Sequence, residues 1–400
     1  MKYVILVPDG MSDIPMESLN DSTCMEAANS PNMDMIARNG VVGMANNIPR
    51  GMTPASDVAN LSILGYDPKK YYCGRGPLEA ANLGVSLSEK DVAFRFNTVT
   101  ISDNKMADYS AGHITTTETS VLVEMLNGAF GNEKIHFYTG TSYRNLLVVR
   151  CDFAEDAEKL SKIKFFPPHD ILDKDISKYL PKNAELVELM MRSKGVLEDC
   201  DINKVRIDLG QNPANMIWIW GQGRKPDMPS FYDAYGISGG MVSAVDLLKG
   251  MARVLGLEVA EVPGATGYYD TNYEGKAQAA LDILEHKDMA FIHVEAPDEA
   301  GHNGDVHAKI KAIENFDSKI TGPVIKELSK RGDYRALILP DHPTPINMRT
   351  HTSDPVPFAM CGKGITPDEV LVFSEKSAKA GSLSLVQGWD LMKMLISKKE

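Results

Sequence analysis

The stretch Met289-Ala-Phe-Ile-His-Val294, followed at once by Glu295-Ala-Pro-Asp298-Glu-Ala-Gly-His302, decides how this chain folds and what it holds. Its first six residues are apolar apart from the histidine, which is typical of a buried strand in a parallel sheet. Asp298 and His302 come directly after that strand. Because residues just beyond the carboxyl ends of parallel strands meet in one crevice, both side chains are expected at a functional site.

A second apolar run, Ala336-Leu-Ile-Leu-Pro340, leads into Asp341-His342, and His351 follows shortly after. A third, at residues 3–7, ends in Pro8-Asp9-Gly10. Three imidazoles and several carboxylates at one sheet edge are more than a single ion needs. They favour two divalent cations of the zinc or manganese type, with magnesium or cobalt as further options. Each residue alone could be a surface group, but an adjacent Asp-His pair after a strand serves no packing purpose.

Length, composition and charge exclude several classes of protein. Four hundred residues suggest two domains, and 43% apolar with 24% charged residues is ordinary for a soluble globular protein. No apolar run approaches the roughly 20 residues that span a bilayer, and the apolar start is too short for a signal peptide. A net charge of −12 argues against nucleic-acid binding. Five scattered cysteines without a C-x-x-C pair fit a reducing cytoplasm.

Strands and helices alternate at both ends of the chain, with a different texture between them. We predict an α/β catalytic domain with a mostly parallel sheet from residues 1–92 and 215–400. An α+β domain is inserted at 93–214, where a β-hairpin is expected at 135–150. The apolar run at 216–220 is expected to resume the βαβ pattern. Helices are predicted at 240–255 and 305–329, and the oligomeric state is not predicted.

Covalent catalysis at such a site needs a nucleophile, and Ser56 is the best candidate. It lies in Thr53-Pro-Ala-Ser56-Asp57, where a helix is expected to begin, and helix N-termini favour anions. A bound metal would make its alkoxide accessible near neutral pH. A serine at this place is more often an ordinary N-cap, and hydrolysis by metal-bound water would need no nucleophilic side chain, so these alternatives stay open. The remaining histidines at positions 136, 169, 286, 293 and 307 are given no role.

These residues resemble the cofactor-independent phosphoglycerate mutases of the archaeal type, which belong to the alkaline-phosphatase-like metalloenzyme superfamily. The resemblance covers essentially the whole chain. It is carried by Val7-Pro-Asp9-Gly10, residues 53–68, Gly74-Arg-Gly-Pro-Leu-Glu79, Gly112-His113, Ser142-Tyr-Arg144, residues 295–305, Pro340-Asp-His342-Pro and Arg349-Thr-His351-Thr. Ala55 departs from the pattern, because relatives commonly have glycine there.

The resemblance implies an alkaline-phosphatase-like sandwich with a smaller inserted lid domain, and it implies a ligand set for two ions. One ion would be held by Asp298, His302 and His351. The other would be held by Asp9, Asp341 and His342 together with the Ser56 oxygen. Ser56 would take the phosphoryl group from 3-phosphoglycerate and return it to the 2-hydroxyl, so no bisphosphoglycerate is needed.

The lid would have to hold the phosphorylated sugar acid and exclude water. Arg144, after the hairpin turn, suits a bidentate clamp on the carboxylate. His113 suits a hydrogen bond or proton transfer to the hydroxyls. Arg224 suits a grip on phosphate, while Arg75 and Lys276 are weaker candidates. A solvated surface charge is the competing interpretation of each arginine.

Other functions compete with phosphoglycerate mutase activity. The same metal and serine site could act as a phosphatase, phosphodiesterase or phosphopentomutase, or as a homoserine kinase. A kinase needs a nucleotide site, and the sequence has no G-x-x-x-x-G-K-[ST] motif. A metal-bearing binding protein without catalysis is a third class, which the full ligand set and Ser56 disfavour.

Overall fold

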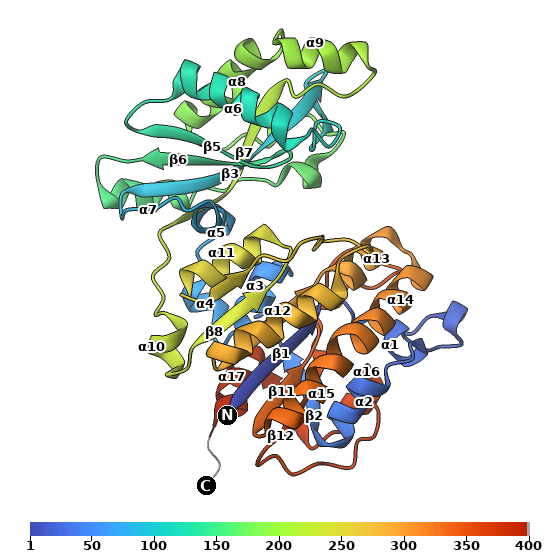
Figure 1. Cartoon of the computed structure of the whole chain (residues 1–400). Coiled ribbons are helices and arrows are strands. Elements are labelled where there is room, and N and C mark those ends of the chain that lie inside the picture. Colours follow the sequence, from blue (N-terminus) through green and yellow to red (C-terminus); the bar gives the residue numbers. More distant parts are fainter. Residues whose placement is uncertain (398–400) are drawn as a thin grey trace. The chain divides into compact units, whose positions relative to one another are not determined.

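The computed structural model, shown in Figure 1, describes residues 1–397, and the chain divides into two compact units. The first unit joins Met1–Tyr72 to Met228–Glu400, and the second is Cys73–Asp227. The second unit is therefore longer at both ends than the predicted inserted domain, 93–214. The reason is that the strands at its two ends pair with each other in one sheet, so neither can belong to the first unit.

The first unit is built on an eight-stranded sheet with the order β13-β2-β12-β11-β1-β10-β8-β9. Its strands are β1 (Lys2–Pro8), β2 (Gly40–Asn46), β8 (Gly239–Val242), β9 (Glu258–Ala260), β10 (Met289–Val294), β11 (Tyr334–Ile338), β12 (Val356–Gly362) and β13 (Leu383–Gln387). Only β12 among them runs antiparallel to its neighbours. The predicted mostly parallel α/β sheet is confirmed.

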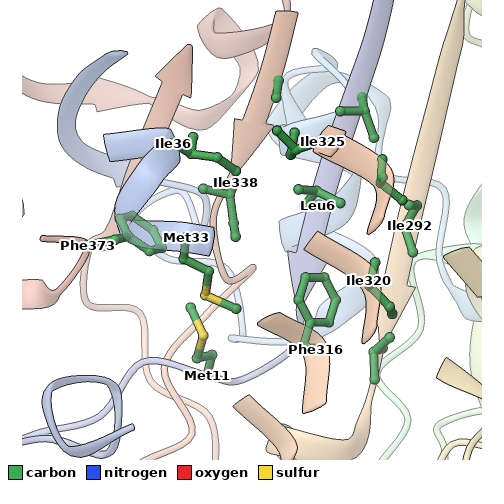
Figure 2. Close-up of a cluster of buried hydrophobic side chains, with 14 of the residues drawn as sticks. Leu6, Met11, Met33, Ile36, Ile292, Phe316, Ile320, Ile325, Ile338 and Phe373 are labelled. Atoms are coloured by element: carbon green, nitrogen blue, oxygen red, sulfur yellow. The ribbon is translucent and has the colours of Figure 1, made fainter. Parts of the chain in front are cut away.

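The central strands β11, β1 and β10 are buried on both faces, which explains their unbroken apolar sequences. Side chains of one face, such as those of Leu6 and Ile292, pack with Phe316 in the largest apolar cluster of this unit (Figure 2). A phenylalanine buried in this way contributes about 3–5 kcal/mol against its replacement by alanine. These buried strands lead to the polar side chains that follow them in the sequence.

Helices cover the sheet of the first unit. They are α1 (Cys24–Ala27), α2 (Pro31–Arg38), α3 (Ser56–Ile63), α4 (Pro68–Tyr71), α10 (Phe231–Tyr235), α11 (Asp246–Val254), α12 (Tyr273–His286), α13 (Ala296–Asn303), α14 (Val306–Phe316), α15 (Gly322–Arg331), α16 (Glu375–Ala378) and α17 (Gly388–Ile396), with a 3-10 turn at Glu17–Leu19. The predicted helix 305–329 is present as α14 and α15, joined by a π-helical turn at Asp317–Thr321.

The predicted helix 240–255 is wrong over its first residues, because Gly239–Val242 forms strand β8 and helix α11 starts only at Asp246. Pairing with β10 overrides the local pattern there. Gly239 lacks the side chain that would meet Met289 of the neighbouring strand.

The second unit has a five-stranded antiparallel sheet in which β3 pairs with β4, β6 and β7. Its strands are β3 (Asp91–Ser102), β4 (Lys105–Asp108), β5 (Ile135–Thr141), β6 (Arg144–Arg150) and β7 (Met216–Arg224), and its helices are α5 (Arg75–Asn82), α6 (Thr116–Phe130), α7 (Ala154–Ser161), α8 (Ala184–Leu197) and α9 (Asp201–Asp208), with 3-10 turns at Pro168–Ile171 and Ile176–Lys178. The predicted hairpin is confirmed as β5 and β6. The expectation that residues 216–220 resume the parallel sheet is wrong, because β7 pairs with β3. Among the residues described, no helix is long and apolar enough to cross a bilayer.

Candidate active site

The predicted metal ligands lie together in the first unit, at the carboxyl ends of its three central strands. Asp9 follows β1, Asp298 and His302 lie one turn apart on α13 after β10, and Asp341 follows β11. Because these strands are parallel neighbours, their ends share one sheet edge. We call the group the strand-end site; its members are Asp9, Ser56, His293, Asp298, His302, Asp341, His342 and His351.

One set of donor atoms in the strand-end site comes from Asp298, His342 and His351, and these atoms lie within 4.8 Å of one another. His302 adjoins it. Its Nε2 atom is 2.9 Å from Nε2 of His351 and 3.2 Å from Oδ2 of Asp298. Two carboxylate oxygens and three imidazole nitrogens therefore face one small volume, which suits a borderline divalent cation.

A second set consists of Asp9, His293 and Asp341, all buried and again within 4.8 Å of one another. His293 had no role in the sequence prediction, yet its Nε2 atom lies 3.0 Å from Oδ2 of Asp9. Nε2 of His342 is close to this set as well, 3.7 Å from Asp9 and 3.5 Å from Asp341. His342 thus lies between the two sets, and the second set includes an imidazole that sequence reasoning missed.

Three buried atoms of this second set test whether it fits a cation. Neither carboxylate oxygen of Asp9 has a hydrogen-bond partner, and neither does Nε2 of His293. Burial and the neighbouring Asp341 and Asp298 carboxylates raise the pKa of Asp9 well above its ordinary value. Buried polar groups are normally satisfied, so a set of orphaned oxygen and nitrogen lone pairs converging on one point fits a metal ion.

Ser56 is the first residue of α3, and Ala55 is the N-cap, so Ser56 is not an ordinary cap. Its Oγ lies 3.2 Å from Nε2 of His342. Asn60 lies one turn later. Its Nδ2 amide donates a hydrogen bond of 2.9 Å to the Ser56 carbonyl and one of 2.8 Å to Oδ2 of Asp341. This buried amide ties the start of the helix to the end of β11, and no local signal in the sequence marks it.

Backbone contacts orient two further imidazoles. Nδ1 of His302 lies 3.1 Å from the Arg349 carbonyl, and Nδ1 of His351 lies 3.3 Å from the Pro54 carbonyl. A carbonyl can only accept, so each Nδ1 carries the proton and each Nε2 faces the site. The peptide that precedes Ser56 by two residues is thereby fixed to a candidate ligand.

Charge pairing sets the protonation of the first donor set. Burial alone would raise the pKa of Asp298, but hydrogen bonds from His302 and His351 hold it well below its ordinary value. Burial opposes the charge on His302, but the Asp298 carboxylate raises the pKa of that imidazole to about 9. Burial lowers the pKa of His293 to about 4, so it is neutral and able to offer a lone pair.

The predicted substrate residues His113, Arg144 and Arg224 lie in the second unit. His113 and Arg144 belong to a connected set of rings and guanidinium groups that we call the aromatic–basic cluster; it consists of Arg75, Arg95, Tyr109, His113, Tyr143, Arg144, His169 and Trp220. The Arg144 guanidinium lies 5.5 Å from the ring centre of Tyr143, and the His113 ring lies 6.0 Å from the same ring.

Trp220 is the centre of the cluster. The guanidinium groups of Arg95 and Arg75 lie 5.2 Å and 5.5 Å from its ring. Arg95 is buried, and burial lowers its pKa to about 10 even though Glu79 lies 3.4 Å away. Two guanidinium groups at one ring, one of them buried, suit the binding of an anion.

Arg224 lies apart from this cluster within the same sheet. It pairs with Val92 near the start of β3, whereas Arg144 pairs with Asn97 in the middle of that strand. Its guanidinium lies 3.6 Å from Glu89 and 4.0 Å from Glu158. Its charge is thus already matched by acids, and a grip on phosphate by Arg224 stays a prediction.

Comparison with known proteins assigns the chain to a family. A family described as 2,3-bisphosphoglycerate-independent phosphoglycerate mutase matches residues 37–203. The enzyme of that name from Methanothrix thermoacetophila is 50% identical over 99% of this chain and all of its own length. A probable enzyme of the same name from Geobacter sulfurreducens is 46% identical over the full length of both chains.

Two solved structures are similar to this chain. A protein from Pyrococcus horikoshii is 30% identical with a TM-score of 0.83, covering 100% of this chain and 98% of its own. The cofactor-independent phosphoglycerate mutase from Thermoplasma acidophilum is 28% identical with a TM-score of 0.67, covering 99% of each chain.

Proposed function

The chain belongs to the 2,3-bisphosphoglycerate-independent phosphoglycerate mutase family, and on that premise we propose how its own residues interconvert 3-phosphoglycerate and 2-phosphoglycerate. The observation that carries the proposal is the position of Ser56. Its hydroxyl opens a helix, lies 3.2 Å from His342, and is joined through Asn60 to the second donor set.

Ser56 acts as the phosphoryl carrier. Its oxygen attacks the phosphorus of 3-phosphoglycerate, the bond between phosphorus and the 3-oxygen breaks, and the serine proton ends on that 3-oxygen. Glycerate then turns, its 2-oxygen attacks the phosphoserine, and the 2-hydroxyl proton returns to Ser56. Atoms and charge balance over the cycle, and no bisphosphoglycerate enters it.

His342 and the helix start prepare this oxygen. In the metal-free site the unprotonated Nε2 of His342 accepts a hydrogen bond from the Ser56 hydroxyl, which holds Oγ beside the candidate metal ligands. The dipole of α3, whose first residue is Ser56, favours the negative charge that gathers there.

The donor sets described above would hold two divalent cations, and manganese or zinc suits their mixed nitrogen and oxygen ligands. Asp298, His302 and His351 would hold one ion. Asp9, Asp341 and His342, with the Ser56 oxygen, would hold the other, and His293, whose Nε2 lies beside Asp9, is a further candidate ligand of that ion. When bound, such ions neutralise phosphoryl charge and make a serine alkoxide accessible near neutral pH.

The aromatic–basic cluster is the proposed source of charge for the sugar acid. Arg144 is its predicted clamp on the carboxylate, because a planar guanidinium matches two carboxylate oxygens. His113 is the predicted partner of the hydroxyls. The predicted roles of Arg224 and of the second unit as a lid rest on the family resemblance. A cytoplasmic location is likewise a prediction.

A coupled assay tests the function. Purified protein with 3-phosphoglycerate and Mn²⁺, without bisphosphoglycerate, is expected to form 2-phosphoglycerate. Ribose phosphates, and homoserine with ATP, serve as parallel substrates for the competing activities. Absence of 2-phosphoglycerate with two ions bound per chain would contradict the proposal.

A further inference from the structure

Thr344 lies behind the strand-end site, two residues after His342, and is fully buried. Its hydroxyl donates a short hydrogen bond to Oδ1 of Asp298, and its oxygen lies 3.3 Å from Nδ1 of His342. These two partners come from different strand ends. One hydroxyl therefore contacts two candidate ligands that the fold delivers separately.

The directions of these two hydrogen bonds follow from the chemistry of the groups. The Asp298 carboxylate can only accept, so the single hydroxyl proton of Thr344 belongs to that bond. The Thr344 oxygen is then an acceptor for His342, which must carry its proton on Nδ1. Nε2 of His342 is left with its lone pair directed toward Ser56.

The groups that contact Nδ1 of the other histidines show how Thr344 differs from them. His302 and His351 have their Nδ1 atoms fixed by backbone carbonyls. For His342 that acceptor is a side-chain hydroxyl. A substitution can therefore remove this acceptor without moving the backbone. Nδ1 of His293 likewise lies near a side-chain hydroxyl, 3.4 Å from Oγ of Ser243, but Thr344 in addition donates to a second candidate ligand, Asp298.

We propose that Thr344 is a positioning residue that fixes the tautomer of His342 and ties it to Asp298, so that the two candidate ion sites keep one spacing. The proposal rests on the proposed function only in treating these residues as metal ligands. The Thr344 proposal extends the proposed function by assigning a role to a residue that touches neither the substrate nor the reacting atoms.

A buried lysine holds Thr344 in place. The ammonium of Lys309, on α14, donates 2.8 Å to the Thr344 carbonyl, 2.9 Å to Oδ2 of Asp13 and 3.2 Å to the Ser12 carbonyl. The side chains of Lys309 and Asp13 are both fully buried. Asp13 also accepts from the backbone N–H of Ile346, two residues beyond Thr344. The loop after β11 is therefore clamped from both sides to the loop after β1.

The close packing of two glycines around Thr344 leaves it little freedom. A Cβ at Gly10 would lie 2.6 Å from the Thr344 hydroxyl, and a Cβ at Gly301 would collide with the Thr344 backbone. Gly10 also has φ +61°, which favours glycine. The hydroxyl is thus held where both of its hydrogen bonds are made.

The test is Mn²⁺ binding by equilibrium dialysis, which needs no substrate and is independent of mutase activity. Thr344→Val keeps the shape but removes the hydroxyl, and it is expected to weaken Mn²⁺ affinity about 10- to 100-fold. Thr344→Ser restores the hydroxyl and is expected to stay within about 3-fold of the wild type. At saturating Mn²⁺, the valine variant should lose kcat with KM nearly unchanged.

The matched control is Thr321→Val, at another fully buried threonine of the first unit whose hydroxyl has no hydrogen-bond partner. Unfolding temperatures of the metal-free proteins separate misfolding from ligand positioning. Wild-type Mn²⁺ affinity in Thr344→Val, or an equal loss in Thr344→Ser and Thr344→Val, would overturn the proposal.

A second variant tests the clamp. Lys309→Met alone would leave Asp13 buried without its cation, so Lys309→Met with Asp13→Asn removes both charges together. If the clamp acts through Thr344, the double variant loses Mn²⁺ affinity, and Thr344→Val adds little to that loss. Wild-type affinity in the double variant would contradict the role of the clamp.

Discussion

The strand-end site and the aromatic–basic cluster carry opposite charges and are built in opposite ways. The first places acids and imidazoles after parallel strands, buried and held by second-layer hydrogen bonds. The second places guanidinium groups and rings on an antiparallel sheet and its turns, joined by cation–π and edge-to-face ring contacts. A cation site needs several donors at fixed spacing, whereas an anion site needs charge and flat surfaces. The two regions should therefore fail differently when they are altered.

The largest effect is expected from Ser56→Ala. Loss of a nucleophile removes the covalent route, so turnover should fall by at least about 10⁴-fold. The hydroxyl is only one of several donors, so most of the Mn²⁺ binding should persist. Activity assay and equilibrium dialysis on the same preparation check both parts. Turnover near that of the wild type would remove Ser56 from the mechanism.

Asp9→Asn should separate metal binding from folding. The Asp9 oxygens accept no hydrogen bond and the pKa of the carboxyl is raised, so the neutral amide is expected to stabilise the metal-free protein. Mn²⁺ affinity should fall about 100-fold, and turnover with it. Thermal unfolding checks both parts. The unfolding temperature of the variant should be higher than that of the wild type without Mn²⁺, and Mn²⁺ should raise it less. A variant less stable without metal, yet binding Mn²⁺ normally, would show that Asp9 is structural.

Arg144→Ala should affect substrate binding and leave metal binding alone. Loss of a charged hydrogen-bond donor costs about 1.5–3 kcal/mol, so KM should rise about 10- to 100-fold. Arg224→Ala is the matched comparison in the same sheet. Because Arg224 is already paired with Glu89 and Glu158, its KM should change less. Equal effects would extend the anion-binding region along β7.

How far the sequence predicts these two regions depends on how local their geometry is. Asp298 and His302 follow one strand and lie one helical turn apart, so their meeting is contained in a single stretch of sequence. His293 was missed because its role depends on pairing. The register that sets Val7 beside His293 brings Asp9 next to it, and that register cannot be read from either strand alone.

The aromatic–basic cluster was predicted only in part for the same reason. Arg144 and His113 were named from the family resemblance. Trp220, the ring that the guanidinium groups of Arg75 and Arg95 contact, was not. Arg95 lies opposite Trp220 because β3 pairs antiparallel with β7, and the sequence pattern of β7 pointed to the other sheet. Contacts across an antiparallel sheet depend on which strands pair, so residue types alone do not reveal them.

The smallest effect is a pH dependence of the metal-free protein. Asp298 raises the pKa of His302 to about 9, above its ordinary value of 6.5. A raised folded-state pKa stabilises below the unfolded value and loses that contribution as pH rises through about 9. The wild type should therefore lose a few degrees of unfolding temperature between pH 7 and 10 relative to His302→Gln. If the unfolding temperatures of the wild type and of His302→Gln change equally with pH, the pairing of Asp298 with His302 contributes nothing to stability.

The most direct test of the central claim is rapid quenching of the enzyme with 3-phosphoglycerate labelled with ³²P, followed by digestion and peptide analysis. Label on the peptide that contains Ser56, forming and decaying at rates compatible with turnover, is the predicted result. Formation of 2-phosphoglycerate at the wild-type rate with no label on Ser56 would contradict the account.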